Sequence, residues 1–165
     1  MNATHAGVLA LAVLVASLGS AAAVPGGAVL VVEDAETGET YLDTPVSNGT
    51  TVALEYNHSV EKTRVYEAYT VRGDRLEMTH MEFESYGWGL PSRANVTREN
   101  GTFIYDPPGS YERLTVAPGD IAGHRLHVGD RTYDLVSLSD GRSVTLSIHH
   151  RSALAALLDF DSPSD

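Results

Sequence analysis

The sequence of 165 residues contains no cysteine and a single lysine, Lys62. Without cysteine, the chain can form neither the disulfide bonds that stabilise many small exported domains nor a zinc site with thiolate ligands. Only 11 residues are Lys or Arg, against 22 Asp or Glu, and the formal net charge is −11. This balance argues against the basic face that nucleic-acid-binding proteins need, so we expect no nucleic-acid partner.

The near replacement of lysine by arginine, together with the excess of acid, is typical of salt-adapted proteins of halophilic archaea. Dense carboxylates hold water and counter-ions at the surface, and high salt screens their mutual repulsion. We therefore interpret the acidity as an adaptation to the medium and not as the signature of a partner.

The N-terminus is apolar: residues 6–24 contain no charged side chain and are followed by Pro25-Gly26-Gly27, which breaks a helix. A run of this length is close to the ~20 residues that cross a bilayer, and it also suits a long signal-peptide core. We expect residues 1–27 to form a hydrophobic helix that is either a cleaved signal peptide or a membrane anchor, with a buried core helix as the alternative. The protein is then exported, either secreted or held at the outer face of the cell membrane.

From residue 28 onward, short β-type segments alternate with turn pairs such as Asn48-Gly49, Asn100-Gly101 and Asp140-Gly141. These pairs tolerate the positive φ of tight hairpins. The expected strands are Ala28–Glu33, Thr40–Asp43, Thr50–His58, Arg64–Arg72, Arg75–Glu84, Thr102–Tyr105, Glu112–Val116, His124–Val128, Arg131–Leu138 and Ser143–His150. The pattern predicts one all-β domain over residues 28–160, an antiparallel β-sandwich or small barrel, with a short C-terminal helix over 152–160. Residues 161–165 are expected to be a disordered tail.

Two ionisable residues fall on strand faces that are otherwise apolar. The even positions of residues 52–60 are apolar apart from His58, and the odd positions of residues 65–71 are apolar apart from Glu67. Since an unpaired charge in the core is costly, we expect His58 and Glu67 to meet each other or to converge on a third group. Such a pair either fixes the strand register or binds a ligand. Ser59 points to the opposite face of a regular strand, which spoils a Ser–His dyad, so no catalytic residue is assigned.

In the strand over 75–84 the apolar residues shift from even to odd positions. Leu76 and Met78 share one face of a regular strand, while Met81 and Phe83 fall on the other. A β-bulge near Thr79-His80 would bring all four onto one face. After this strand, Gly87, Trp88, Gly89 and Pro91 form an unusual tight loop. The loop is either an aromatic plug over the end of the sheet or a binding loop whose glycines let a ligand approach the backbone.

The sequence contains no motif that predicts a cofactor or a metal, so we expect neither. The seven histidines contain no His-Glu-x-x-His spacing, and the sequence has no Walker motif, nucleotide-binding glycine fingerprint or serine-hydrolase elbow. A metal held by His58, Glu67 and a distant residue stays open as an alternative.

The segments Leu54–Glu61, Val65–Glu67 and Phe83–Pro91 together resemble the family of domains of unknown function numbered eighteen-fifty. Its pattern is a His-Ser-Val strand, a Glu in the next strand and a Phe-x-Ser-x-Gly-x-Gly-x-Pro loop. The residues of this sequence that match the family's pattern, and are therefore candidates for its site, are His58, Ser59, Glu67, Gly87, Gly89 and Pro91. Trp88 stands where the pattern has a small residue. The resemblance implies small exported proteins, often encoded beside TAXI-type tripartite (TRAP) transporters that import organic acids, with no settled activity.

We therefore expect a non-enzymatic exported accessory protein that assists a TRAP-type transporter in taking up organic solutes. Its expected partners are the transporter's membrane subunits or solute-binding protein, a small organic acid, and the membrane if the N-terminal helix is uncleaved. The Gly87–Pro91 loop would make the contact, supported by His58 and Glu67. The alternative is an extracytoplasmic module that binds a small ligand or metal through His58 and Glu67 directly. A third interpretation, an envelope hydrolase with Glu67 as base, ranks below both.

Overall fold

A computed structural model describes residues 25–85 and 96–152 of the chain. The chain divides into one unit over Val29–His149 and a second unit formed by Met1–Ala28 with His150–Asp165. Of the second unit, only residues 25–28 and 150–152 are described, as the ends of two strands. The site discussed below lies wholly within Val29–His149. No helix within the described residues is long and apolar enough to span a membrane.

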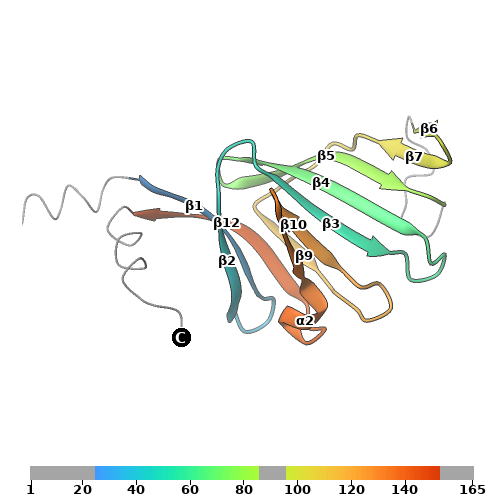
Figure 1. Ribbon diagram of the computed structural model, residues 1–165. Coiled ribbons are helices and arrows are strands. Elements are labelled where there is room, and N and C mark those ends of the chain that lie inside the picture. Colours follow the sequence, from blue (N-terminus) through green and yellow to red (C-terminus); the bar gives the residue numbers. More distant parts are fainter. Residues whose placement is uncertain (1–24, 86–95, 153–165) are drawn as a thin grey trace, which may run out of the picture. The chain divides into compact units, whose positions relative to one another are not determined.

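In the part of the chain that the structure describes, eight strands form the larger of two sheets (Figure 1). They are β3 (Thr51–Asn57), β4 (Arg64–Arg72), β5 (Arg75–Phe83), β6 (Thr97–Glu99), β7 (Thr102–Tyr105), β8 (Ser110–Tyr111), β10 (Arg125–Val128) and β11 (Arg131–Asp134). Their order is β11-β10-β3-β4-β5-β7-β6, with β8 also paired to β5. Every pairing in this sheet is antiparallel. The turn between β6 and β7 is the expected Asn100-Gly101 pair, with φ of 51° and 95°.

The smaller sheet has four strands: β1 (Pro25–Asp34), β2 (Thr40–Val46), β9 (Arg113–Val116) and β12 (Val144–Ser152). Their order is β2-β1-β12-β9. The two sheets are bonded to each other, because the Thr44 hydroxyl on β2 lies 3.0 Å from the Tyr133 hydroxyl on β11. Thr44 is only 1% exposed, and Tyr133 is half-buried. The all-β prediction is confirmed.

The core is built from the inner faces of these strands. Fully buried side chains come from both sheets, among them Leu30, Val52, Phe83, Leu126 and Leu146. On β5 the register shifts so that Ala68 pairs with His80 while Tyr69 pairs with Met78. Thr79 is thus the extra residue of a β-bulge, as predicted, and the bulge keeps the apolar residues on either side of it on one face.

The expected strand over Arg131–Leu138 is wrong in its second half, where the chain forms the short helix α2 (Leu135–Ser139). Asp134 caps this helix, since its side chain accepts hydrogen bonds from the amides of Val136 and Ser137 at 3.0 and 3.1 Å. Burial of Leu135 fixes the helix against the core, and Asp140 ends it in a left-handed conformation. A helix of one turn is too short to show a helical period in the sequence.

Several expectations fall outside the described residues. These are the N-terminal helix over 1–27 apart from its last three residues, the helix over 152–160 apart from Ser152, the tail over 161–165, and the loop residues Gly87, Trp88, Gly89 and Pro91.

Candidate functional site

Glu67 lies on the inner face of the large sheet, as the alternation predicts. It pairs with Leu54 of β3 on one side and with Met81 of β5 on the other. The same cross-strand row continues to Leu126 on β10 and Tyr105 on β7. Because residues that pair across strands share a face, the Glu67 carboxylate stands in a row of otherwise uncharged side chains.

Two tyrosines bind this carboxylate. The hydroxyl of Tyr56 donates to Oε1 of Glu67 at 3.0 Å, and the hydroxyl of Tyr69 donates to Oε2 at 2.9 Å. Burial raises the pKa of both tyrosines, and the negative charge of Glu67 and its hydrogen bonds raise it further. Both therefore stay protonated donors at neutral pH. Tyr69 is 3% exposed, so its hydroxyl needs a partner inside the protein, and Glu67 provides it.

His124 precedes β10 and stacks on Tyr56, with ring centroids 4.6 Å apart and an angle of 17° between the rings. Burial lowers the pKa of His124, so the ring is neutral at pH 7. Its Nδ1 is buried and, in the part of the chain that the structure describes, has no hydrogen-bond partner. A buried nitrogen of this kind is uncommon and marks a place where a ligand or water is expected.

His58 is placed by a turn and not by a strand. β3 ends at Asn57, and the next residues turn back so that the Lys62 amide donates to the His58 carbonyl at 2.9 Å. The expected apolar face through Val60 is therefore wrong, and Val60 is 69% exposed. The Nδ1 of His58 accepts from the amides of Val60 and Glu61 at 3.3 and 3.2 Å. Since Nδ1 accepts, the neutral ring carries its proton on Nε2.

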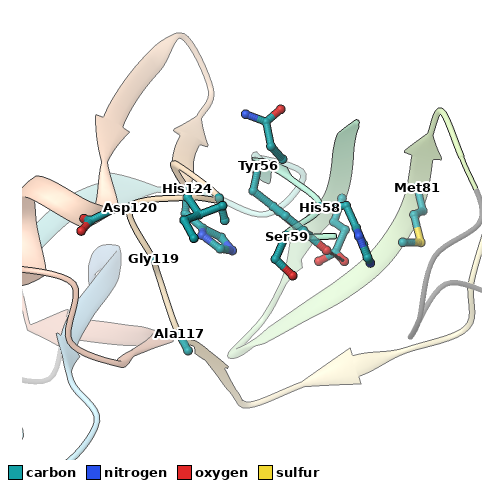
Figure 2. Close-up of a pocket in the computed structure, with 12 residues that line it drawn as sticks. Tyr56, His58, Ser59, Met81, Ala117, Gly119, Asp120 and His124 are labelled. Carbon is teal, nitrogen blue, oxygen red and sulfur yellow. Dashed lines mark hydrogen bonds between the residues drawn. The ribbon is translucent and has the colours of Figure 1, made fainter. Parts of the chain in front are cut away.

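The described hydrogen bonds neither join His58 to Glu67 nor bring the two onto a shared third group, so the predicted pairing is not found there. The two side chains have separate hydrogen-bond partners, yet both line one cavity of about 610 Å³. The lining residues are Tyr56, Asn57, His58, Ser59, Glu67, Met81, Ala117, Gly119, Asp120, Ile121, Ala122 and His124. Figure 2 shows the rings of His58 and His124 on either side of Tyr56, with the Ser59 hydroxyl between them. Ser59 lines the same cavity as His58. The prediction that the two side chains point to opposite faces assumed a regular strand, but β3 ends at Asn57.

The loop over residues 117–122 forms one wall and is tied to the sheet. The amide of Asn57 donates to the carbonyl of Ala122 at 2.8 Å, at the end of β3. Within the loop, the amides of Ala122 and Gly123 donate to the carbonyl of Gly119 at 3.0 and 2.8 Å. Ile121 is 68% exposed at the cavity rim and supplies an apolar surface there. The wall is therefore held in place before any ligand arrives.

Sequence reasoning missed three members of this site: Tyr69 and Tyr56 as partners of Glu67, and His124. A signal existed for the tyrosines, because both fall on the inner face by alternation and an inward hydroxyl needs a partner. His124 reaches Tyr56 only through the pairing of β10 with β3, two strands that are far apart in the chain. No local sequence pattern predicts such a pairing.

No group of three His, Asp or Glu side chains within the described ranges 25–85 and 96–152 is placed to hold a metal ion. The polar atoms and the apolar walls of the cavity are suited to contact an organic ligand.

The fold and the site define an all-β domain with a carboxylate–tyrosine cluster at a cavity on the inner face of its large sheet. The model of the family described as Domain of unknown function (DUF1850) matches residues 52–135, just over half of the chain. The chain belongs to this family, and the resemblance seen in the sequence is confirmed. The matched residues include Tyr56, Glu67, Tyr69 and His124. Comparisons with curated proteins and with solved structures gave no match.

Proposed function

We propose that this protein is an exported, non-enzymatic binding module, a β-sandwich or small barrel whose cavity at Glu67 holds a small organic ligand. The observation that carries the proposal is the Glu67 carboxylate, fixed by Tyr56 and Tyr69 at the cavity of about 610 Å³. Ligand sites in proteins commonly have this size and combine apolar walls with a few placed polar groups.

The cavity has the mixture of surfaces that such sites use. Met81, Ile121 and the ring of Tyr56 supply apolar area, while His58 and Glu67 supply polar atoms with fixed partners. Because those polar groups are already held by the protein, little ordering is needed when a ligand binds. Export is supported by the charge-free apolar run over residues 6–24.

The tautomer of His58 supports a binding role over a hydrolytic one. A Ser–His dyad needs a neutral imidazole nitrogen with a free lone pair beside the hydroxyl. In His58 the Nδ1 lone pair faces the amides of Val60 and Glu61, so Nε2 carries the proton. The neutral ring therefore has no lone pair left with which to activate Ser59.

Thermal denaturation of the full chain at high salt tests the proposal. A panel of small organic acids, amines, amino acids and polyols is added at millimolar concentration. A ligand at about one hundred times its Kd should stabilise the native state by about 2.7 kcal/mol, which raises Tm by several degrees. The shift should shrink in Glu67→Gln and persist in Glu77→Gln, a carboxylate paired with Arg72 away from the cavity. A panel in which no compound raises Tm, or in which Glu67→Gln responds like the native protein, would count against the site.

We also propose, on the strength of family membership, that the module serves a TRAP-type transporter of the TAXI class. The contact would run through the Gly87–Pro91 loop to the transporter's membrane subunits or its solute-binding protein. Affinity purification of the tagged full-length protein from its own membranes, at native salt, is the test. Transporter subunits should co-purify with the native protein and with Glu77→Gln, but not with Trp88→Ala. Recovery of the protein alone would remove this proposal and leave the binding module untouched.

A further inference from the structure

Within the described ranges 25–85 and 96–152, Glu67 differs from the other shielded carboxylates in having no arginine partner. Among the described residues, six carboxylates are buried or half-buried: Glu33, Asp34, Glu55, Glu67, Glu77 and Glu82. Five of them lie within 4.0 Å of an arginine nitrogen, in the pairs Glu33–Arg113, Asp34–Arg142, Glu55–Arg64, Glu77–Arg72 and Glu82–Arg64. Glu67 has two tyrosine hydroxyls in their place. The tyrosines satisfy hydrogen bonds, but they leave the negative charge uncompensated.

The described lining of the cavity offers no arginine or lysine to supply the missing charge. Its ionisable members besides Glu67 and Tyr56 are Asp120, His58 and His124. Burial lowers the pKa of His124, so this ring is neutral at pH 7. An organic acid would find no lysine or arginine in the described lining to pair with its carboxylate. The described walls of the cavity offer it a carboxylate instead, which repels it.

The surfaces beside Glu67 suit the apolar part of an organic cation. The hydroxyl of Tyr56 bonds the carboxylate, the ring of Tyr56 is stacked with that of His124, and Met81 pairs with Glu67 across the strands. Aromatic rings attract ammonium groups through their negative faces, and the attraction grows when water is excluded. A hard, strongly hydrated cation such as Na⁺ or Mg²⁺ would gain less from these surfaces, because oxygen ligands and not aromatic rings replace its water.

We propose that the ligand of this cavity is a small organic ammonium ion whose positive charge pairs with Glu67. This inference rests on the proposed function, since it names the chemical class of the ligand for the same site. It departs from the small organic acid that the family resemblance implies. The ammonium group supplies the counter-charge that arginine supplies to the five other shielded carboxylates, and its alkyl part covers the rings of Tyr56 and His124.

Isothermal titration of the full chain with matched probes tests the inference. Choline is compared with 3,3-dimethylbutan-1-ol, its neutral isostere, and butylamine with butan-1-ol; succinate represents organic acids. We expect the cations to bind at least about tenfold more tightly than their neutral partners, as a lost charge-assisted contact predicts. The comparison on the native protein is informative even if a variant folds poorly. Glu67→Gln should abolish the preference for the cations, while Glu77→Gln keeps it.

The outcomes separate this inference from the proposed function. Tighter binding of succinate or of the neutral alcohols, with Glu67→Gln unimpaired, would overturn the ammonium ligand and keep a binding module. Stabilisation by KCl or NaCl alone, lost in Glu67→Gln and not increased by any amine, would assign the site to an inorganic cation. Absence of binding by every probe and by the wider panel would remove the proposed function, and the inference with it.

Discussion

The hydroxyl of Tyr69 lies 2.9 Å from Oε2 of Glu67, two residues along the same strand and on the same inner face. With Tyr56 on the neighbouring strand donating to Oε1, the carboxylate accepts one hydrogen bond on each oxygen. The arrangement allows an acidic side chain in a row of uncharged residues without an arginine. The two tyrosines therefore stabilise the sheet and also hold Glu67 in place at the cavity.

Tyr69→Phe and Tyr56→Phe should each lower the free energy of unfolding, because one oxygen of Glu67 then loses its donor. A hydrogen bond to a charged group is worth about 1.5–3 kcal/mol, and partial exposure of Glu67 places the expected loss near the lower end. We expect the larger loss for Tyr69→Phe, since Tyr69 is the more buried tyrosine. Urea denaturation measures both. Tyr66→Phe, on the outer face of β4, serves as the control and should change stability by less than about 0.5 kcal/mol.

How far the sequence alone predicts the structure can be judged from three residues. Glu67 was placed on the inner face correctly, because alternation within β4 is a local property that the backbone enforces. The bulge at Thr79 is predictable for the same reason, because the apolar residues shift from even to odd positions within a single strand. His58 was misplaced, because the end of β3 is set by a turn in which Lys62 adopts a φ of 57°. A lysine in that conformation has no clear sequence signature.

The remaining parts of the site depend on contacts between segments far apart in the chain. The stacking of His124 on Tyr56 follows from the pairing of β10 with β3, and the loop over 117–122 reaches the cavity through the Asn57–Ala122 hydrogen bond. Register between distant strands is fixed by packing of the whole core, so a local pattern could not bring these residues together.

Thr44→Val should destabilise the protein through the link between its two sheets. The substitution keeps the size of the side chain but removes the partner of the Tyr133 hydroxyl, which lies 3.0 Å away. Loss of one neutral hydrogen bond at a buried position predicts a decrease of about 1 kcal/mol in the free energy of unfolding. Chemical denaturation measures the change, and Thr40→Val, at an exposed position of β2, is the matched control. Equal effects of the two substitutions would show that the Thr44–Tyr133 contact contributes nothing.

Asp34 should make stability depend on pH in the acid range. Its carboxylate accepts from the Thr37 amide, the Tyr41 hydroxyl and the Glu36 amide, and these bonds hold the pKa of Asp34 well below its usual range, with Arg142 adding to the effect. Because the folded pKa lies below the unfolded value of about 3.9, the stabilisation is complete above that value and is lost as the pH falls through the folded pKa. Asp34→Asn lacks this contribution.

The measurement is Tm against pH, from neutral to strongly acidic, for the native protein and for Asp34→Asn. The native protein should be the more stable at neutral pH, and the gap should close below about pH 4. A gap that stays constant down to the lowest pH would show that the pKa of Asp34 is not depressed by folding.

His124→Phe should separate stability from binding. The substitution removes the buried Nδ1 that lacks a partner in the described part of the chain, and it keeps an aromatic ring to stack on Tyr56. An unsatisfied buried polar atom costs about 1–3 kcal/mol, so we expect the free energy of unfolding to rise, by about 1 kcal/mol once imperfect packing of the new ring is included. A residue retained at such a cost fits a role in binding, since active and binding sites commonly trade stability for function.

His127→Phe is the matched comparison, because His127 also has a buried nitrogen without a described partner but uses Nδ1 to bond Thr132 at 3.0 Å. That substitution removes one unsatisfied atom together with one satisfied atom, so its gain should be smaller. The cavity ligand should bind His124→Phe more weakly and His127→Phe unchanged, because His124 lines the cavity and His127 does not. A stability loss in His124→Phe would mean that Nδ1 is satisfied in solution, most simply by water, and would make the nitrogen a structural group and not a ligand contact.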